Sequence, residues 1–377
     1  MNSGNHFSAV VRSPAQYRSM DHRIWSKLPA ELLEHILSFL PLKTFLNLRS
    51  TCKGFRSLIF SPSFIAKHSS SSSPFSSFIL LCHPQFHRHF PLYDCTLGTW
   101  RNISLSFSDL FHSSHPSPLL SSSGGLFCLS DSPSSSSLLV CNILAMTSRR
   151  IEFPTYSSHF EHLTLVSTPN GYKIFMLCSG SASNNAFVYD SNTLSWHRFD
   201  ANFDLILSDN SHQQGVFYNG GLYFTTPEPF SVVRFDLESR KWERSQGLLP
   251  IQLSFVRLVS EGENVLYLVG GIGSNGISRS IKIWEMDDES GNWVELESLP
   301  DMMCRKFVSV CYHNYEHIYC FWHHGMICIC CYTWPEILYY KVSRRTWHWL
   351  PRCPSLPHKW SCGFKWFSFV PKLYALV

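Results

Sequence analysis

A motif with a fixed internal spacing recurs along most of this chain, and it constrains the fold more than any other feature. Each copy has an aromatic or apolar residue, then Asp or a substitute, then a polar turn, with Trp expected six positions after the Asp. In chain order the copies are Tyr93-Asp94 to Trp100, Cys141-Asn142 to Ser148, Tyr189-Asp190 to Trp196, Phe235-Asp236 to Trp242, Met286-Asp287 to Trp293 and Tyr340-Lys341 to Trp347. The second copy lacks the tryptophan. The anchor positions are separated by 48, 48, 46, 51 and 54 residues, which indicates a structural repeat of about fifty residues.

Each repeat contains two predicted hairpins. One surrounds the anchor, because apolar strand-forming segments precede and follow it, as at 187–189 and 196–199. The other lies midway between anchors, where Gly124-Gly125, Asn170-Gly171 or Gly220-Gly221 precedes another strand-rich segment. Two hairpins give four strands in each repeat.

Radial packing of the repeats is the arrangement that we expect. Four-stranded sheets cannot bury both faces alone, and a propeller solves this while shortening exposed edges. Residues 75–377 number 303, enough for about six blades of fifty residues. We expect the tryptophans to pack between blades and the anchor side chains to cap turn backbone groups. Residues 363–377 should supply a closing strand. The blade register is open near Gly270-Gly271, and Asn314-Tyr315-Glu316 is expected to replace a missing glycine turn.

Before the repeats, the pattern predicts three short helices. Pro29 suits a first helical position, apolar residues then recur at helical spacing, and Pro41 ends the first helix. Further helical segments are expected at about 42–50 and 52–60. So small a unit buries its apolar side chains poorly. The excess predicts either a partner interface or packing onto the following domain, and the pattern alone does not separate them.

The same segment resembles an F-box motif. The resemblance rests on Leu28-Pro29-Ala30-Glu31-Leu32-Leu33, Ile36-Leu37-Ser38-Phe39-Leu40-Pro41, Leu48-Arg49-Ser50-Thr51-Cys52-Lys53-Gly54-Phe55 and Ser61-Pro62-Ser63-Phe64. It implies docking onto a Skp-type adaptor, and through it onto a cullin and a RING subunit. The adaptor-binding residues that it implies are Leu28, Pro29, Leu32, Leu33, Ile36, Leu37, Leu40, Pro41, Leu48, Arg49, Cys52, Lys53 and Phe55.

The repeats resemble degenerate kelch repeats, and the whole chain resembles the plant F-box/kelch-repeat proteins. The segment Met20 to Pro29 is similar to the branch of that family that contains UNUSUAL FLORAL ORGANS. We therefore expect a small all-α F-box of three short helices followed by an all-β kelch-type propeller of six blades. The expected domains are a flexible leader at 1–22, the F-box at 23–68, a serine-rich linker at 69–74 and the propeller at 75–377.

The resemblance implies a substrate-receptor subunit of an SCF-type (Skp-cullin-F-box) ubiquitin ligase, not itself an enzyme. The F-box would dock the adaptor, and propeller loops would recruit an unknown protein target for ubiquitination. Two alternatives stay open. A transcriptional co-regulator scaffold predicts reporter activity that survives deletion of the F-box, and a propeller enzyme or sugar-binding module predicts bound metal or glycan on residues 75–377. The target itself cannot be read from the sequence.

Composition argues against several other classes. A net charge of +4 without basic runs disfavours a direct nucleic-acid role, and no segment has the apolar length of a membrane span. We expect a protein of the cytoplasm and/or nucleus, with its fourteen cysteines mostly free. His323-His324 with Cys328, Cys330 and Cys331 lack the spacing of a zinc site, and Cys328 and Cys330 should share one strand face. The glycine-rich segment at 270–276 lacks the ending of a phosphate loop. No metal or other cofactor is expected.

Overall fold

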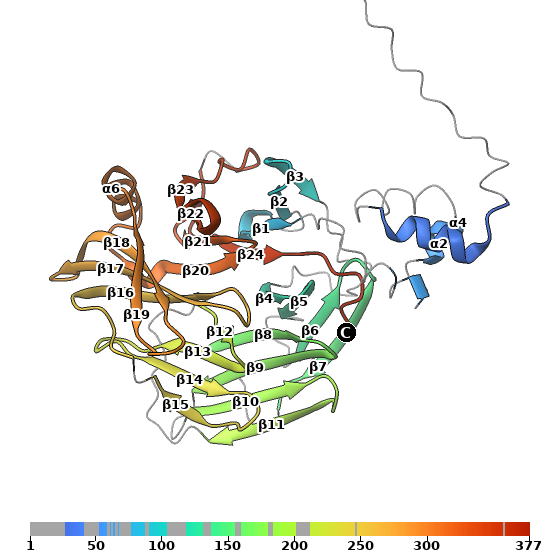
Figure 1. Cartoon of the computed structure of the whole chain (residues 1–377), viewed down its shortest axis with the longest axis horizontal. Coiled ribbons are helices and arrows are strands. Elements are labelled where there is room, and N and C mark those ends of the chain that lie inside the picture. The colour runs from blue at the N-terminus through green and yellow to red at the C-terminus, as the bar shows by residue number, and fades with distance from the viewer. Residues whose placement is uncertain are drawn as a thin grey trace, which may run out of the picture.

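The computed structural model describes residues 27–40, 53–58, 61, 63–64, 67, 77–86, 90–103, 118–130, 137–154, 160–179, 184–200, 212–245, 247–356 and 359–377. Within these residues, 24 strands form six antiparallel sheets of four strands each. Figure 1 shows the sheets arranged as blades around a common axis. The propeller and its six blades are therefore confirmed. The expected leader, the linker and the helix at 42–50 lie outside the described residues.

We number the blades from the first repeat and give their strands from the axis outwards. Blade 1 contains β24 (Lys365–Phe369), β1 (Phe78–Cys82), β2 (Phe90–Asp94) and β3 (Thr99–Ile103); blade 2 contains β4 (Leu119–Ser123), β5 (Leu126–Ser130), β6 (Ser137–Asn142) and β7 (Thr147–Glu152). Blade 3 contains β8 (His162–Thr168), β9 (Gly171–Ser179), β10 (Asn184–Asp190) and β11 (Ser195–Asp200); blade 4 contains β12 (Val216–Tyr218), β13 (Gly221–Thr225), β14 (Val232–Asp236) and β15 (Trp242–Arg244). Blade 5 contains β16 (Leu253–Ser260), β17 (Leu266–Ser274), β18 (Ile277–Met286) and β19 (Trp293–Ser298); blade 6 contains β20 (Ile318–His323), β21 (Met326–Cys331), β22 (Trp334–Lys341) and β23 (Thr346–Trp349).

The described helices are few. The F-box contributes α2 (Ala30–Ser38) and α4 (Lys53–Leu58), and α6 (Asp301–Val310) lies between blades 5 and 6. Single turns of 3-10 helix occur at Pro84–Phe86, Tyr315–His317 and Val342–Arg344. In the described part of the chain, no helix is long and apolar enough to cross a lipid bilayer.

The ring is closed by the C-terminal segment, as expected from its length. β24 pairs antiparallel with β1 over five residues, from Phe78 opposite Phe369 to Cys82 opposite Lys365. Blade 1 thus takes its innermost strand from the end of the chain and its other three from the beginning of the propeller. Closure in this way pairs β1 on both of its edges.

In five blades the anchor side chain caps the turn between the third and fourth strands, as expected, whereas the anchor of blade 6 is Lys341, which has no side-chain acceptor. An anchor side-chain oxygen accepts a backbone N–H two or three residues later, as from Leu97 to Asp94 (3.0 Å), from Asn192 to Asp190 (2.8 Å) and from Glu238 to Asp236 (3.0 Å). Four residues after the anchor the backbone turns left-handed in all six blades. These residues are Gly98, Met146, Leu194, Arg240, Gly291 and Arg345. The spacing of six residues between anchor and tryptophan is therefore set by a turn conformation that the blades share.

The repeat tryptophans lie between neighbouring blades, as predicted. Each pairs across the last two strands with the residue before the anchor, as Tyr93 does with Trp100. Trp100 donates from Nε1 to the carbonyl of Pro351, at the end of blade 6, at 2.7 Å. Trp196 donates to the carbonyl of Glu152, at the end of blade 2, at 2.8 Å. Trp242, Trp293 and Trp347 pack into the apolar clusters that join their blades to blades 3, 4 and 5.

The structure settles the register at Gly270-Gly271. Both residues lie inside β17, and the turn before that strand is at 261–264. A side chain at Gly271 would meet Ser278 Oγ at 2.2 Å and the Phe255 ring at 2.6 Å. These glycines thus leave space for side chains of the neighbouring strands, and they do not form a turn.

Blade 6 departs from the expected register. Residues 315–317 form a 3-10 turn that leads into β20, so the expectation that Asn314-Tyr315-Glu316 replaces the glycine turn is wrong. The turn between β20 and β21 lies instead at His324 and Gly325, whose φ values of 45° and 82° are left-handed. Helix α6 was not predicted from the sequence. Its buried residues Cys304, Phe307 and Val308 follow helical spacing and join the cluster between blades 5 and 6.

Asn142, which replaces the anchor aspartate in blade 2, has a second role. Its Oδ1 caps the turn by accepting from the N–H groups of Leu144 and Ala145 at 3.0 and 3.2 Å. Its Nδ2 donates to the carbonyls of Lys372, Leu373 and Ala375 at 3.0, 3.3 and 2.9 Å. A carboxylate could cap the turn but could not donate. The amide therefore holds the chain that leaves the closing strand.

This arrangement predicts that exchanging an amide and a carboxylate will change the stability much more at anchor Asn142 than at anchor Asp190. Asn142→Asp should lower the free energy of unfolding by about 2–4 kcal/mol, because a buried carboxylate would face carbonyl oxygens. Asp190→Asn should change it by less than about 0.5 kcal/mol, since the turn acceptor stays and only a weak surface contact to Lys173 is lost. Urea denaturation of both variants measures the difference, and equal stabilities would contradict the role assigned to Asn142.

Candidate functional site

Helix α2 divides its apolar residues between two faces. Leu32, Ile36 and Phe39 recur at helical spacing and are 45, 36 and 59% exposed. Leu33, Leu37 and Leu40 form a second row one position later, and they pack into an apolar cluster in which Leu37 is only 3% exposed. Burial of one row gives the helix its packing energy. The exposed row, which we call the outer stripe, has no such structural role in the described residues.

The two ends of the F-box are tied together beneath α2. Glu34 accepts hydrogen bonds from Ser63 Oγ at 2.7 Å and from Lys67 Nζ at 3.3 Å. The Ser63 hydrogen bond is the main reason that the pKa of the Glu34 carboxyl is lowered. Phe64, next to Ser63, is fully buried in the same cluster as Leu37. The terminal motif thus fixes the orientation of α2.

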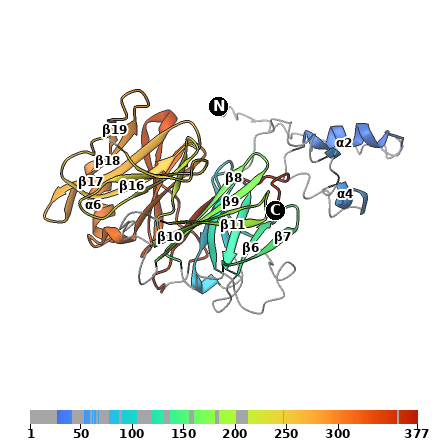
Figure 2. The same cartoon turned by 90° about the horizontal axis from the view of Figure 1, so that it is seen from below.

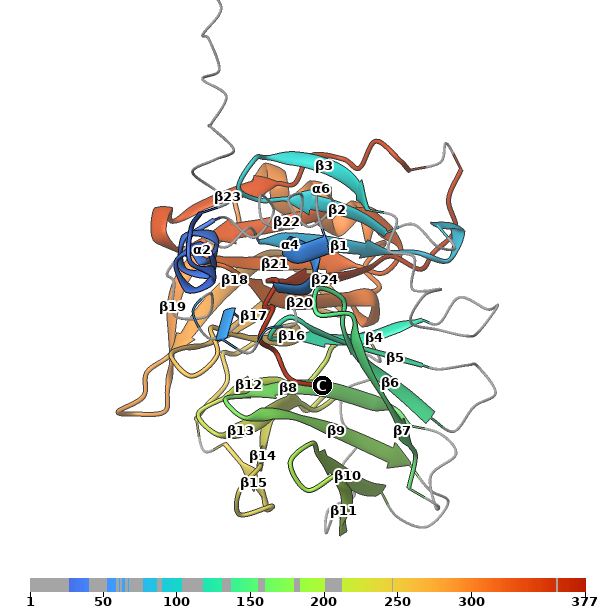
Figure 3. The ribbon, with the colours of Figure 1, turned by 90° about the vertical axis from the view of Figure 1, so that its right-hand side faces the viewer.

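The inner row of α2 packs against the propeller. One apolar cluster contains Leu33, Leu37, Leu40, Phe55, Leu58 and Phe64 of the F-box together with Leu144, Ala145 and Leu373 of the propeller. Leu144 and Ala145 belong to the turn that Asn142 caps, and Leu373 follows the closing strand. Figure 3 shows α2 and α4 beside this C-terminal segment. The inner face of the helix therefore packs onto the propeller, and the outer face stays available for a partner interface.

The predicted adaptor-binding residues fall into three groups. Leu28, Pro29, Leu32, Ile36 and Lys53 are exposed or half-buried, whereas Leu33, Leu37, Leu40 and Phe55 belong to the cluster with the propeller. Pro41, Leu48, Arg49 and Cys52 lie outside the described residues. The prediction missed Phe39, although its spacing from Leu32 and Ile36 could have placed it on the outer stripe.

The topology gives the propeller two different faces. Turns between first and second strands, and between third and fourth strands, lie on one face. The connections between blades and the loops between second and third strands lie on the other, which we call the connection face. The F-box packs on the first face through the turn of blade 2. Figure 2 shows α2 and α4 to one side of the strands, beside β6 and β7. The connection face is therefore not covered by the described F-box residues.

A side-chain hydrogen bond joins each pair of neighbouring blades near the axis. Serine and threonine hydroxyls do this between the first five blades, Arg257 between blades 5 and 6, and His323 between blades 6 and 1. The pairs, from the junction of blades 1 and 2 onwards, are Ser122 with Ser368 O, Ser121 with Leu165 N, Thr164 with Gly215 N, Ser260 with Phe217 O, Arg257 with Ile318 O, and His323 with Ser368 Oγ. Such bonds satisfy inner-strand groups that no neighbouring strand pairs.

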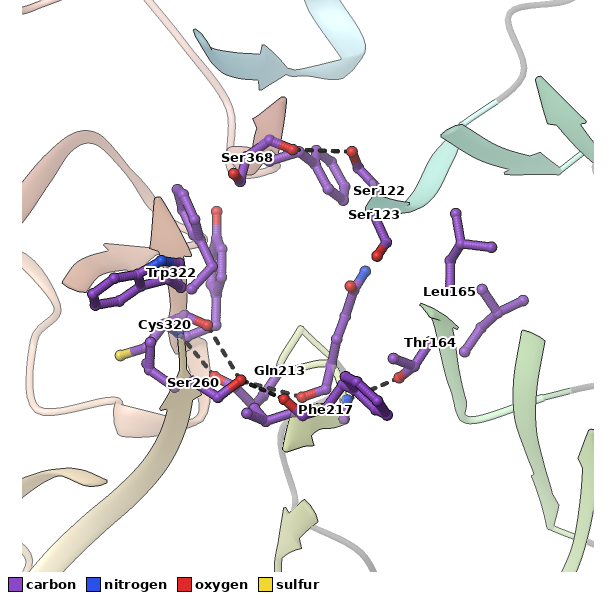
Figure 4. Close-up of a pocket in the computed structure, with 18 of the residues that line it drawn as sticks. Ser122, Ser123, Thr164, Leu165, Gln213, Phe217, Ser260, Cys320, Trp322 and Ser368 are labelled. Atoms are coloured by element: carbon purple, nitrogen blue, oxygen red, sulfur yellow. Dashed lines mark hydrogen bonds between the residues drawn. The ribbon is translucent and has the colours of Figure 1, made fainter. Parts of the chain in front are cut away.

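These bonds surround an axial cavity of about 360 Å³, lined by the inner strands of all six blades. Figure 4 shows Ser122, Ser368, Trp322 and Thr164 around it. Gln213 crosses between blades 5 and 6, where Nε2 donates to the carbonyls of Leu258 and Cys320 at 3.3 and 3.2 Å and Oε1 accepts from Cys320 N at 2.8 Å. The cavity reaches from Lys365, at the beginning of β24, to Val370 beyond its end.

Comparisons with known proteins agree with this two-part architecture. The F-box domain model matches residues 25–67, and the KIB1-4 beta-propeller model matches residues 102–320. An F-box/kelch-repeat protein of Arabidopsis thaliana is 55% identical over 374 residues, covering 95% of this chain and 90% of that protein. The chain belongs to the plant F-box/kelch-repeat protein family.

More distant relatives cover nearly the same span. F-box only protein 6 of Arabidopsis thaliana is 27% identical, over 89% of this chain and 71% of that protein. Protein UNUSUAL FLORAL ORGANS of the same plant is 24% identical, over 89% and 80%. This F-box/kelch-repeat protein therefore matches these relatives over most of its length. The propeller model that matches is of the KIB1-4 type, so the kelch type expected for the blades rests on the family name.

The cysteine and histidine cluster of blade 6 is divided between sheet faces in this F-box/kelch-repeat protein. Cys328 and Cys330 share the face towards blade 1, as predicted, whereas Cys331 faces blade 5. The thirteen described cysteines are free thiols. Among the described residues, no three His, Cys, Asp or Glu side chains are grouped closely enough to hold a metal ion.

One thiol and imidazole pair does come together. Cys95 Sγ lies 3.3 Å from His323 Nε2, and His323 Nδ1 lies 2.9 Å from Ser368 Oγ. Burial, followed by the Asp94 carboxylate, raises the pKa of the Cys95 thiol to about 12. Burial and the neighbouring His324 lower the pKa of His323 to about 3. Both groups are thus held neutral near pH 7, which is the opposite of a thiolate nucleophile beside an imidazolium.

The contact between the two domains gives a direct prediction. Leu373→Ala should lower the free energy of unfolding by about 2–4 kcal/mol, because Leu373 is 2% exposed among F-box side chains. It should also increase amide hydrogen exchange in α2, since that helix packs on this residue. Leu376→Ala, in the same tail but 64% exposed, should leave both unchanged. Unaltered exchange in α2 with Leu373→Ala would contradict the contact.

Proposed function

We propose that this protein is a substrate-receptor subunit of an SCF-type ubiquitin ligase. The division of α2 carries the proposal, because the outer stripe of Leu32, Ile36 and Phe39 remains exposed after the F-box has packed on the propeller. Apolar rows of this kind on small helical units commonly form protein interfaces. In F-box proteins the expected partner is a Skp-type adaptor, which would bring the cullin and RING subunits.

The propeller would present the target on its connection face. That face lies opposite the turns that carry the F-box, so adaptor and target would not compete for one surface. Within it, the connection from blade 5 to blade 6 exposes Met302 and Tyr312 at the two ends of α6, at 76 and 85%. Apolar side chains exposed on loops of a rigid scaffold are suited to binding a protein. Catalysis would then arise from proximity to an enzyme held by the RING subunit.

Co-purification with a Skp-type adaptor tests the adaptor site. Leu32→Glu with Ile36→Glu should weaken binding at least tenfold, because two charges would enter an apolar interface, about 1.4 kcal/mol or more. Leu28→Ala with Pro29→Ala should also weaken adaptor binding. Thermal stability should stay within about 1 kcal/mol, since Leu32 and Ile36 are already exposed.

Val294→Glu is the matched control. It adds a charge to an apolar side chain that is 57% exposed, but on β19 of blade 5, and adaptor binding should be unchanged. Undiminished adaptor binding by the Leu32 and Ile36 variant would show that the outer stripe is not the docking surface.

A further inference from the structure

The axial cavity contains a lysine whose ammonium group has no ion-pair partner among the described residues. Lys365 is the first residue of β24, so it lies at the connection-face end of the cavity. It forms no hydrogen bond or ion pair with any residue that the structure describes. Burial lowers the pKa of its ammonium group. A cation placed this way costs folding energy, which suggests a role other than stability.

Other basic groups gather at the same end. The His212 ring stacks on Tyr332 with ring centroids 4.0 Å apart, and His317 lies 5.6 Å from it. Burial is the main reason that the pKa of His212 is lowered to about 4, and the charges of Lys365, His317 and Arg257 contribute to the same shift. Glu161 is the only carboxylate among the described residues that line the cavity, and its charge acts on His162. Lys365 is the only lysine or arginine among those lining residues.

Part of the cavity wall is aromatic. Phe160, Phe217, Tyr319, Trp322 and Phe367 come from four different blades. Most lining hydroxyls already join blades, as Ser122, Thr164 and Ser260 do. A volume of about 360 Å³ is at the small end of the range for ligand sites, roughly 300–1,000 Å³. The described wall thus offers apolar contact and the ammonium group of Lys365, beside hydroxyl and amide groups that mostly bind the blades to one another.

We propose that this end of the axial cavity binds a small organic oxyanion, a carboxylate or phosphate ester on an apolar or aromatic body. The Lys365 ammonium group would hold the oxyanion as a point charge. The aromatic wall would cover the body of the ligand. The proposal goes beyond the receptor function and does not depend on it. Binding at this end would also place the ligand next to the connection face, where a bound molecule could alter target contacts.

Calorimetric titration of the full chain with benzoate and with phenyl phosphate tests the site. At least one should bind, and neutral benzamide should bind at least tenfold more weakly than that anion. Lys365→Met should weaken anion binding at least tenfold, while Lys365→Arg should stay within about threefold because the charge is kept. Lys359→Met removes an exposed lysine outside the described lining, and anion affinity should not change.

Thermal unfolding without ligand separates a binding role from a structural one. Lys365→Met should raise the melting temperature by about 2–4 °C, because a half-buried charge with no ion-pair partner among the described residues is removed. A lysine needed for folding would lower it. The proposal is overturned if neither anion binds at 10 mM, if benzamide binds as tightly as the anions, or if Lys365→Met retains full anion affinity. The titration contains neither adaptor nor target, so its failure would leave the receptor proposal intact.

Discussion

The pairing of β24 with β1 is the interaction on which the other features of this molecule depend. It closes a ring whose other five blades are each continuous in sequence, and it does so with five residue pairs. The same strand brings Lys365 to the axis and delivers Leu373 to the F-box cluster. One segment of about ten residues therefore contributes to ring closure, to the axial site and to the contact between the domains. Loss of that strand would remove all three together, because propeller stability relies on closure.

Side chains at the axis complete what the strand pairing begins. Inner strands have one edge without a partner, and each blade here binds its neighbour with a side chain from that edge. Arg257 is the most demanding case, since its buried guanidinium donates to the carbonyls of Val256, Tyr315 and Ile318 at 2.6 Å each. Three carbonyl dipoles disperse a charge that burial would otherwise make costly. Side-chain hydrogen bonds near the axis thus join the neighbouring blades to one another.

Sequence could predict the elements that repeat, because each repeat has the same backbone requirement. An anchor that caps a turn, followed by a left-handed residue and a tryptophan between blades, leaves a fixed spacing. That spacing predicted six blades, and the length of chain after the last repeat predicted the closing strand. It could not predict features that occur once. α6 interrupts the repeat with helical spacing at Cys304, Phe307 and Val308, and His324-Gly325 replaces a glycine pair. The division of α2 depends on Leu373, about 340 residues away, so the local pattern allowed both outcomes.

The two faces of the propeller differ in how freely their sequences can change. On the F-box face, the turn between third and fourth strands has a residue at positive φ in all six blades and an acceptor side chain in five, and blade 2 also needs an amide donor for the tail. These requirements limit substitution. The described connections on the opposite face have no such shared requirement, as helix α6 shows for one of them. Under the proposed receptor function, recognition of new targets can therefore arise there without disturbing closure or the F-box contact.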